Sequence, residues 1–177
     1  MTSLTRFIER RLKLQVNLQK SAVARPWQRS FLGFTVTDDP QPQRRIAVKA
    51  VARFKDRVRE LTRRYRGVSL ERMIADLNPL LRGWAGYFGF SEWRELTSLD
   101  GWTRRRLRCV VWVQWKTRGR RYQELRRLKV PERTASAAIF SPKGPWRLSS
   151  SSALHRAFTN KRFKAHGLVA MQTIASA

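Results

Sequence analysis

The chain has 177 residues and a formal net charge of +26, carried by 29 arginines and nine lysines against 12 acidic residues. Such a charge repels itself in a compact state unless a polyanion neutralises it. Because arginine binds phosphate bidentately and stacks on bases, the composition favours nucleic acid over a basic surface without a dedicated partner. No apolar run of 18 residues occurs, and the cations are spread over several segments, which argues against a membrane span or an anionic membrane surface.

The N-terminal quarter predicts a small α+β piece. Residues 2–14 carry apolar side chains near one side of a helix. Three antiparallel strands are predicted after it, at the alternating residues 14–18, at 31–36 and at 45–48, with a turn at 37–42. Such a piece is marginal alone, because an isolated hairpin rarely holds in water.

A regular packing seam predicts the first long helix, over residues 50–66. Its apolar residues step by 3, 4, 3 and 4 from Val51 to Tyr65, the spacing of one helical stripe. Basic residues occupy most of the other positions, and Gly67 suits the C-terminal end. The helix should therefore bury one face and leave a cationic face outside.

The second long helix is expected to begin at an N-cap, Ser69, and to carry its apolar stripe through Phe88. Pro79 lies inside it and should kink or divide it, because proline removes a backbone hydrogen bond. We interpret Trp84, Tyr87 and Phe88 as core residues rather than as a surface for base stacking.

A third long helix is predicted from Thr97 to about Lys116, after a connection at 89–95. Thr97 and Asp100 have the spacing of a capping box, which marks a helix start. Cys109 lies within the apolar run of this helix and is expected to be a small buried hydrophobe. As the single cysteine of the chain it excludes a disulfide framework, and we expect a soluble, cytoplasmic protein.

Basic residues are densest around the end of this helix. Segment 102–129 holds eleven of them against the single acid Glu124, and the interleaved aromatic residues indicate a nucleic-acid surface. Beyond it we expect a loop at 141–148, with room for a short strand at its end. Short helices are predicted at 120–128, 131–139, 152–158 and 160–166. The predicted fold class is therefore mainly α, with a small N-terminal α+β piece, a three-helix bundle and a short helical tail.

The residues offer no catalytic or metal centre. A two-metal polymerase or nuclease needs converging carboxylates, and the acidic pair Asp38 and Asp39 lies in a turn without a preceding strand. His155 and His166, with one cysteine, cannot assemble a zinc site. No glycine-rich phosphate loop is present. We therefore expect binding without a cofactor or metal.

Ordered blocks of residues run through the three long helices, at 53–55, 58–64, 77–84, 87–88, 99–108 and 112–116. Their centre is Leu77-Asn78-Pro79-Leu80-Leu81-Arg82-Gly83-Trp84. These blocks resemble the maturase-specific domain (domain X, or thumb) of bacterial group II intron reverse transcriptases. Residues 12–21 and 31–34 are similar to the end of that family's palm, and residues 144–161 resemble its C-terminal tail.

The resemblance implies a division of the chain into three parts. Residues 1–48 would be a remnant of the reverse transcriptase palm, 49–117 the maturase-specific or thumb domain, and 118–177 a basic C-terminal helical extension. The chain departs from the family because it lacks the Tyr/Phe-x-Asp-Asp strand, the fingers and the cysteine pairs of the endonuclease domain. What remains implied is binding of intron RNA without polymerase residues in this chain.

We therefore expect an RNA-binding maturase-type fragment that binds group II intron RNA and assists its folding or splicing. DNA binding stays possible, and the sequence does not fix the oligomeric state. Phosphate contacts are expected from basic side chains of the helices: Arg53, Lys55, Arg59, Arg63, Arg64, Arg82, Arg104, Arg105, Arg106, Arg108, Lys116, Arg120 and Arg121.

Two alternatives are open. In the first, the chain is the thumb half of a split or truncated group II intron RNA-directed DNA polymerase, and an upstream fragment completes the enzyme. In the second, the chain is a decayed remnant that does not fold stably and exposes apolar surface where the palm sheet is missing.

Overall fold

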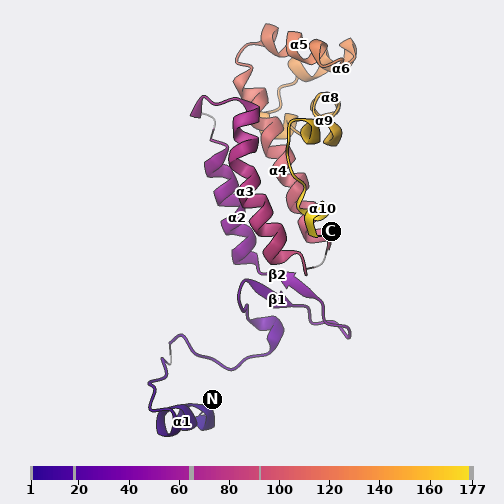
Figure 1. The fold of residues 1–177 in the computed structure, drawn as a ribbon. Coiled ribbons are helices and arrows are strands. Elements are labelled where there is room, and N and C mark those ends of the chain that lie inside the picture. Colours follow the sequence, from indigo (N-terminus) through magenta and orange to yellow (C-terminus); the bar gives the residue numbers. More distant parts are fainter. Residues whose placement is uncertain (1, 18, 64–65, 92, 176–177) are drawn as a thin grey trace.

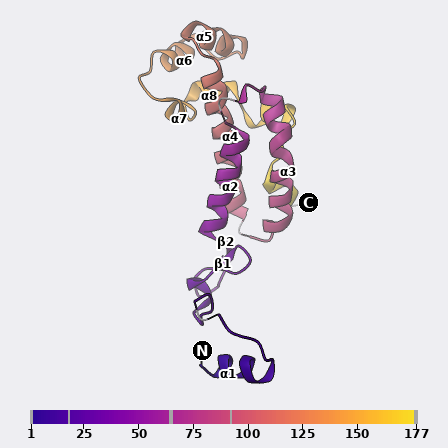
Figure 2. The same ribbon diagram turned by 90° about the vertical axis from the view of Figure 1, so that its left-hand side faces the viewer.

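The computed structural model describes residues 2–17, 19–63, 66–91 and 93–175. Three long helices form the body: α2 (Val48–Leu61), α3 (Leu70–Phe88) and α4 (Trp93–Gln114). They lie side by side, with residues 118–165 at one end and the N-terminal segment at the other, while the last helix, residues 171–175, lies beside α4 closer to the N-terminal segment (Figures 1 and 2). The predicted fold class, mainly helical with a small N-terminal antiparallel sheet, is confirmed.

The N-terminal segment is less regular than predicted. Helix α1 (Thr2–Arg11) forms, and a 3-10 turn, η1 (Pro26–Gln28), precedes a sheet of β1 (Phe34–Val36) and β2 (Arg44–Ile46). The strand predicted at 14–18 is wrong, because residues 14–17 are irregular and residue 18 lies outside the described residues. Alternating polarity makes a strand only where a second strand accepts its hydrogen bonds.

The hairpin is attached to the end of α3. Gly33 has φ +81, a conformation that favours glycine, and its carbonyl accepts the N–H of Ala47 at 2.8 Å. The Phe34 ring lies 4.9 Å from that of Phe88, and Tyr87 Oη donates to the carbonyl of Leu32 at 2.8 Å. These contacts hold the sheet against the three-helix body.

Helix α2 ends earlier than predicted and α4 begins earlier. The hydroxyl of Thr62 donates to the carbonyl of Val58 at 2.6 Å directly after α2, while Gly67, with φ +64, lies in the connection. Helix α4 starts at Trp93, so Thr97 is inside the helix and the predicted capping box is wrong. Tyr65, the last residue of the predicted seam, lies outside the described residues.

Helix α3 begins as predicted and is not divided. Ser69 Oγ accepts the N–H of Arg72 at 3.2 Å, which confirms the N-cap. Pro79 lies inside this 19-residue helix, which continues on both sides of the proline. Phe88 is buried and Trp84 packs partly against the core, but Tyr87 is half exposed.

Within residues 115–175 the body is followed by six short helices: α5 (Arg118–Arg127), α6 (Glu132–Ile139), α7 (Pro145–Leu148), α8 (Ser152–Ala157), α9 (Asn160–Ala165) and α10 (Met171–Ala175). Most follow the predicted positions. The predicted loop at 141–148 is wrong in its second half, which forms α7 on α4, and α10 has no predicted counterpart. Proline at the first position of α7 suits a helix start.

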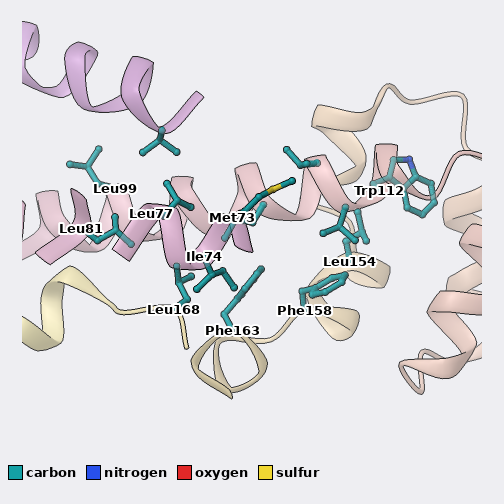
Figure 3. Close-up of a cluster of buried hydrophobic side chains, with 14 of the residues drawn as sticks. Met73, Ile74, Leu77, Leu81, Leu99, Trp112, Leu154, Phe158, Phe163 and Leu168 are labelled. Atoms are coloured by element: carbon teal, nitrogen blue, oxygen red, sulfur yellow. The ribbon is translucent and has the colours of Figure 1, made fainter. Parts of the chain in front are cut away.

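The C-terminal segment closes the core of the three-helix body. Figure 3 shows Ile74 of α3 close to Phe163 and Leu168, and all three side chains are buried. Met171 is fully buried where α10 packs on α3 and α4. The core is one cluster that extends from Ile46 to Met171.

Two polar side chains of the body fix the backbone of this segment. Asn78 donates through Nδ2 to the carbonyl of Gly167 at 2.9 Å and accepts the N–H of Val169 at 3.1 Å. Asp100 accepts the N–H groups of Met171 and Gln172 at 3.1 and 3.2 Å. Burial raises the pKa of Asp100, although these two hydrogen bonds and the charge of Arg104 act in the opposite direction. Asp100, expected at a helix start, therefore holds the start of α10 instead.

The N-terminal segment leaves large apolar side chains exposed. Helix α1 buries none of its described residues. The large apolar side chains that are more than half exposed include Leu4, Phe7, Leu12, Leu14, Val23, Phe31 and Leu32. The exposure of apolar surface expected where the palm sheet is missing is confirmed at Val23, Phe31 and Leu32. Among the described residues, no helix is long and apolar enough to cross a membrane.

Candidate nucleic-acid interface

Several arginines of α4 hold the fold together. Arg105 donates through Nη2 to the carbonyl of Trp146 at 3.0 Å, and Arg106 donates through Nε to Thr62 Oγ1 at 3.0 Å. Arg106 thus joins α4 to the end of α2, and Arg105 joins it to α7. These two side chains are half-buried, so only part of each guanidinium is open to a phosphate.

Arg108 is buried, with 4% of its surface exposed. Its Nε and Nη2 atoms both donate to the carbonyl of Phe158, at 3.1 and 3.0 Å, and the guanidinium lies 5.5 Å from the centre of the Phe163 ring. Burial lowers the pKa of Arg108 to about 10, with a smaller effect of the charge of Arg104. The side chain stays charged at neutral pH, but its position argues against the predicted phosphate contact.

Other predicted contact residues lie on the surface. Arg53, Arg63, Arg82 and Lys116 are exposed, whereas Lys55 and Arg104 are half-buried. Arg64 lies outside the described residues. The exposed cations come from α2, the segment that follows it, α3 and the end of α4, so no single helix gathers them.

Part of the positive charge is paired with carboxylates. Arg59 Nη1 lies 2.6 Å from Asp56 Oδ1, and Arg120 Nη2 lies 2.6 Å from Glu124 Oε1. Arg57 lowers the pKa of Glu60 through a hydrogen bond and its charge. Because the chain has 38 basic and 12 acidic residues, such pairs cannot neutralise more than about a third of the cations.

Arg121 joins the start of α5 to the end of α4. Its Nε atom donates to the carbonyl of Trp112 at 3.2 Å, and its guanidinium lies 4.7 Å from the centre of the Trp112 ring. The side chain is half-buried. It therefore positions the basic helix α5 and leaves only an edge for a phosphate.

Tryptophans and cations meet on one face of the body, which we call the α2–α4–α7 face. Its members are Lys55, Arg59, Trp102, Arg105, Arg106 and Trp146. Lys55 Nζ and the Arg59 guanidinium lie 5.7 and 5.5 Å from the centre of the Trp102 ring, and the Arg105 guanidinium lies 4.2 Å from that of Trp146. The two indole rings are 6.4 Å apart.

This face is hollowed. Between α2, α4 and α7 lies a cavity of about 320 Å³, lined by Arg59, Trp102, Arg106, Cys109, Pro145 and Trp146. Aromatic rings beside cations are the combination that binds unpaired nucleotides. Neither tryptophan was among the expected contact residues, and Trp146 lies in the stretch predicted as a loop. The sequence signal at Trp146 is its position between Pro145 and Arg147 in a strongly basic chain.

A second cavity of about 450 Å³ lies where α2 and α3 meet the hairpin, and its lining includes Arg53, Arg57, Trp84 and Tyr87. Trp84 is tied to the core by rings 4.6 and 4.4 Å away, those of Phe54 and Phe88. These rings cover part of the Trp84 indole, so it offers a base less surface for stacking than the indole of Trp146 does.

The described residues contain no group of three or more histidine, cysteine, aspartate or glutamate side chains able to hold a metal ion. His166, the residue that follows α9, has its Nδ1 atom 3.1 Å from Glu71 Oε1, whereas His155 lies in α8. Burial and the charges of Arg108 and Arg105 lower the pKa of His155. Cys109 is buried, as predicted.

A family model matches the helical body of the chain. Residues 51–129 match the family model described as "Group II intron, maturase-specific domain". The matched segment contains α3, α4 and α5 and most of α2. A comparison with curated proteins finds no match.

Proposed function

We propose, from the premise that residues 51–129 are a maturase-specific domain of group II intron proteins, that this chain binds group II intron RNA and assists its folding or splicing. The family match carries the proposal, and the net charge of +26 supplies its physical basis. In this proposal residues 1–48 derive from a reverse transcriptase palm, 49–117 are the thumb and 118–177 are a basic extension.

Binding would be driven by neutralisation of RNA phosphates. Each phosphate contact releases counterions, so the affinity should fall steeply as salt is added. Specificity for a folded intron would come from the shape of the RNA and from its unpaired bases, because the deep major groove of an RNA helix hides base edges. A binder of this kind stabilises the folded ribozyme without chemistry of its own.

The exposed cations are the proposed phosphate contacts, and we choose Arg53, Arg82 and Lys116 for the test, one from each of three segments of the body. Arg59, Arg63 and Arg120 are exposed as well. A phosphate at Arg59 or Arg120 would have to displace a carboxylate. Such exposed pairs are weak. Arg108 is left out of the proposed set.

The experiment reverses three exposed charges together, Arg53→Glu, Arg82→Glu and Lys116→Glu. We expect the affinity for a group II intron transcript to fall by roughly two orders of magnitude at low salt, without a decrease in melting temperature. The matched control is Arg10→Glu, Arg29→Glu and Lys143→Glu, three exposed residues outside the long helices. Both triple variants lower the net charge equally, so a larger loss from the first set assigns binding to the helical body.

Selectivity and splicing are measured beside it. The transcript competes with a structured RNA of the same length, and self-splicing is followed at limiting Mg²⁺ with and without the protein. Equal affinity for both RNAs and an unchanged splicing rate would reject the maturase proposal, leaving a general RNA binder.

The exposed apolar side chains of the N-terminal segment favour a second candidate, the thumb half of a split reverse transcriptase. Large contiguous apolar surface marks an interaction site, and the side chains of Leu4, Phe7 and Leu12 are all more than half exposed. A polypeptide with fingers and a Tyr-Ala-Asp-Asp-type palm would cover them. Primer extension by that polypeptide with and without this chain decides the question.

The continuous core argues against a decayed remnant that does not fold stably. A single cooperative thermal unfolding transition is expected, and its absence would support decay.

A further inference from the structure

We infer that the cavity of the α2–α4–α7 face is a binding site for one unpaired nucleotide, whose base stacks on Trp146 and whose phosphate lies between Arg59 and Arg106. The inference rests on the proposed function and assigns it a defined subsite. The cavity of about 320 Å³ is at the lower end of the range for small-molecule sites. It has room for a single nucleotide and excludes an RNA duplex.

Trp146 is held in place with part of its ring open. Its carbonyl accepts hydrogen bonds from Arg105 Nη2 at 3.0 Å and from Ser149 Oγ at 2.6 Å, and the Arg105 guanidinium lies 4.2 Å from the ring centre. The residue is 38% exposed. A ring fixed before binding stacks on a base without a further cost in side-chain entropy.

The cations at the cavity are placed for a phosphate. The Arg59 guanidinium lies over Trp102 and pairs with Asp56, whose carboxylate is itself mostly exposed, so a phosphate competes with that ion pair easily. Arg106 is half-buried, with Nε on Thr62 Oγ1. Its position between α2 and α4 lets it add positive charge without moving.

A base enters such a site only when it is free of its own stack. In a duplex each base is covered on both faces, so the indole of Trp146 has no surface to contact. A bulged or looped-out nucleotide exposes a full aromatic face, and stacking tolerates any base. The site therefore adds a preference for RNA with unpaired nucleotides to the general attraction of the cationic surface.

The test compares two labelled, blunt-ended RNA duplexes that differ only in one bulged adenosine, bound to the full chain and followed by fluorescence polarisation. We expect the bulged duplex to bind about tenfold more tightly than the fully paired one. Trp146→Ala should abolish that preference while leaving the affinity for the paired duplex and the salt slope unchanged, because stacking releases no counterions. Trp146→Phe should keep most of the preference.

Trp27→Ala is the matched control. Trp27 is also partly exposed and also has an arginine over its ring, Arg25 at 5.4 Å, but it does not line the cavity. Arg59→Gln is a second variant, on an exposed residue. It should lower the affinity for the bulged duplex more than that for the paired one, and reduce the salt slope with the bulged duplex by about one.

The outcomes separate the two proposals. Equal binding of both duplexes by the unmodified chain, or an undiminished preference in Trp146→Ala or Arg59→Gln, overturns the nucleotide site and leaves the RNA-binding proposal standing. If Trp146→Ala does not fold, Trp146→Phe and Arg59→Gln decide. Failure of the unmodified chain to bind either duplex or the intron transcript overturns the proposed function itself.

Discussion

Neighbouring arginines of α4 have different structural roles because their side chains leave the helix in different directions. Arg104 is half-buried at a basic cavity with Lys161 and Lys164, Arg105 supports Trp146, Arg106 reaches Thr62 and Arg108 points into the core. Composition shows how many cations a segment has, but the direction of each depends on the packing of the helix. A mutation must therefore be judged residue by residue.

Arg108→Ala should destabilise the protein. The variant removes both donors to the carbonyl of Phe158 and the cation beside Phe163, and it leaves a cavity. We expect the free energy of unfolding to fall by about 2–4 kcal/mol, measured by urea denaturation. Arg82→Ala, on an exposed residue of α3, should change it by less than about 0.5 kcal/mol. A stable Arg108→Ala protein with weakened RNA binding would instead make Arg108 a contact residue.

His155 should make the stability depend on pH. Burial, followed by the charges of Arg108 and Arg105, lowers its pKa from the ordinary value of 6.5. The unfolded chain therefore binds the proton first, and the free energy of unfolding should fall as the pH drops through 6.5 toward the lower pKa of the folded state. In His155→Gln the free energy of unfolding, measured by urea unfolding at a series of pH values, should depend less on pH in this range. A variant curve parallel to that of the unmodified chain would show that other groups carry the effect.

At the scale of elements, Asp100 links α4 to α10. Its carboxylate accepts the first two N–H groups of the helix, and α10 buries Met171 against α3 and α4. A helix of five residues has too few internal hydrogen bonds to be stable alone. The position of α10 therefore depends on this carboxylate and on the buried methionine.

Asp100→Ala should release α10 from the body. Two backbone N–H groups lose their acceptor. We therefore expect the free energy of unfolding to fall by about 2–4 kcal/mol and amide exchange to become faster at Met171 and Gln172. Asp56→Ala, which removes an exposed carboxylate, is the control and should change neither quantity. Unchanged exchange in Asp100→Ala would mean that the apolar contacts of Met171 are sufficient.

The long helices and most of the short ones were predictable from the sequence, but α7 and α10 were not. Apolar spacing located α2 and α3, because a long amphipathic stripe identifies a helix even where single residues such as Pro79 do not favour one. Ser69 was the expected N-cap of α3. Helices α7 and α10 have four and five residues, too few for a period, and are held by contacts with distant residues. The apolar alternation at 14–18 lacked a partner strand, a condition that local sequence does not reveal.

The candidate site was predictable only in outline. Its basic character follows from composition, and Arg59, Arg105 and Arg106 were among the predicted residues. Trp102 and Trp146, however, are 44 residues apart in the chain, and only the packing of α7 on α4 brings their rings within 6.4 Å. No periodicity or motif in one sequence encodes that contact.

At the scale of the whole molecule, the charge of +26 lowers the stability of the free protein but strengthens its binding to RNA. Repulsion among the cations destabilises the compact state, and salt screens it over a Debye length of about 10 Å at 0.1 M. The same salt competes with protein cations for RNA phosphates. Screening should therefore strengthen the fold while it weakens the complex.

We expect the melting temperature of the free protein to rise between about 50 and 200 mM NaCl, while the affinity for intron RNA falls about a thousandfold if roughly six phosphates are contacted. Polyphosphate should stabilise the protein at low salt, because a bound polyanion removes the repulsion. Calorimetry and fluorescence polarisation on one salt series measure both quantities. A melting temperature that falls with salt would show that ion pairs such as Arg120–Glu124 outweigh the repulsion, and the excess charge would then need an explanation other than RNA.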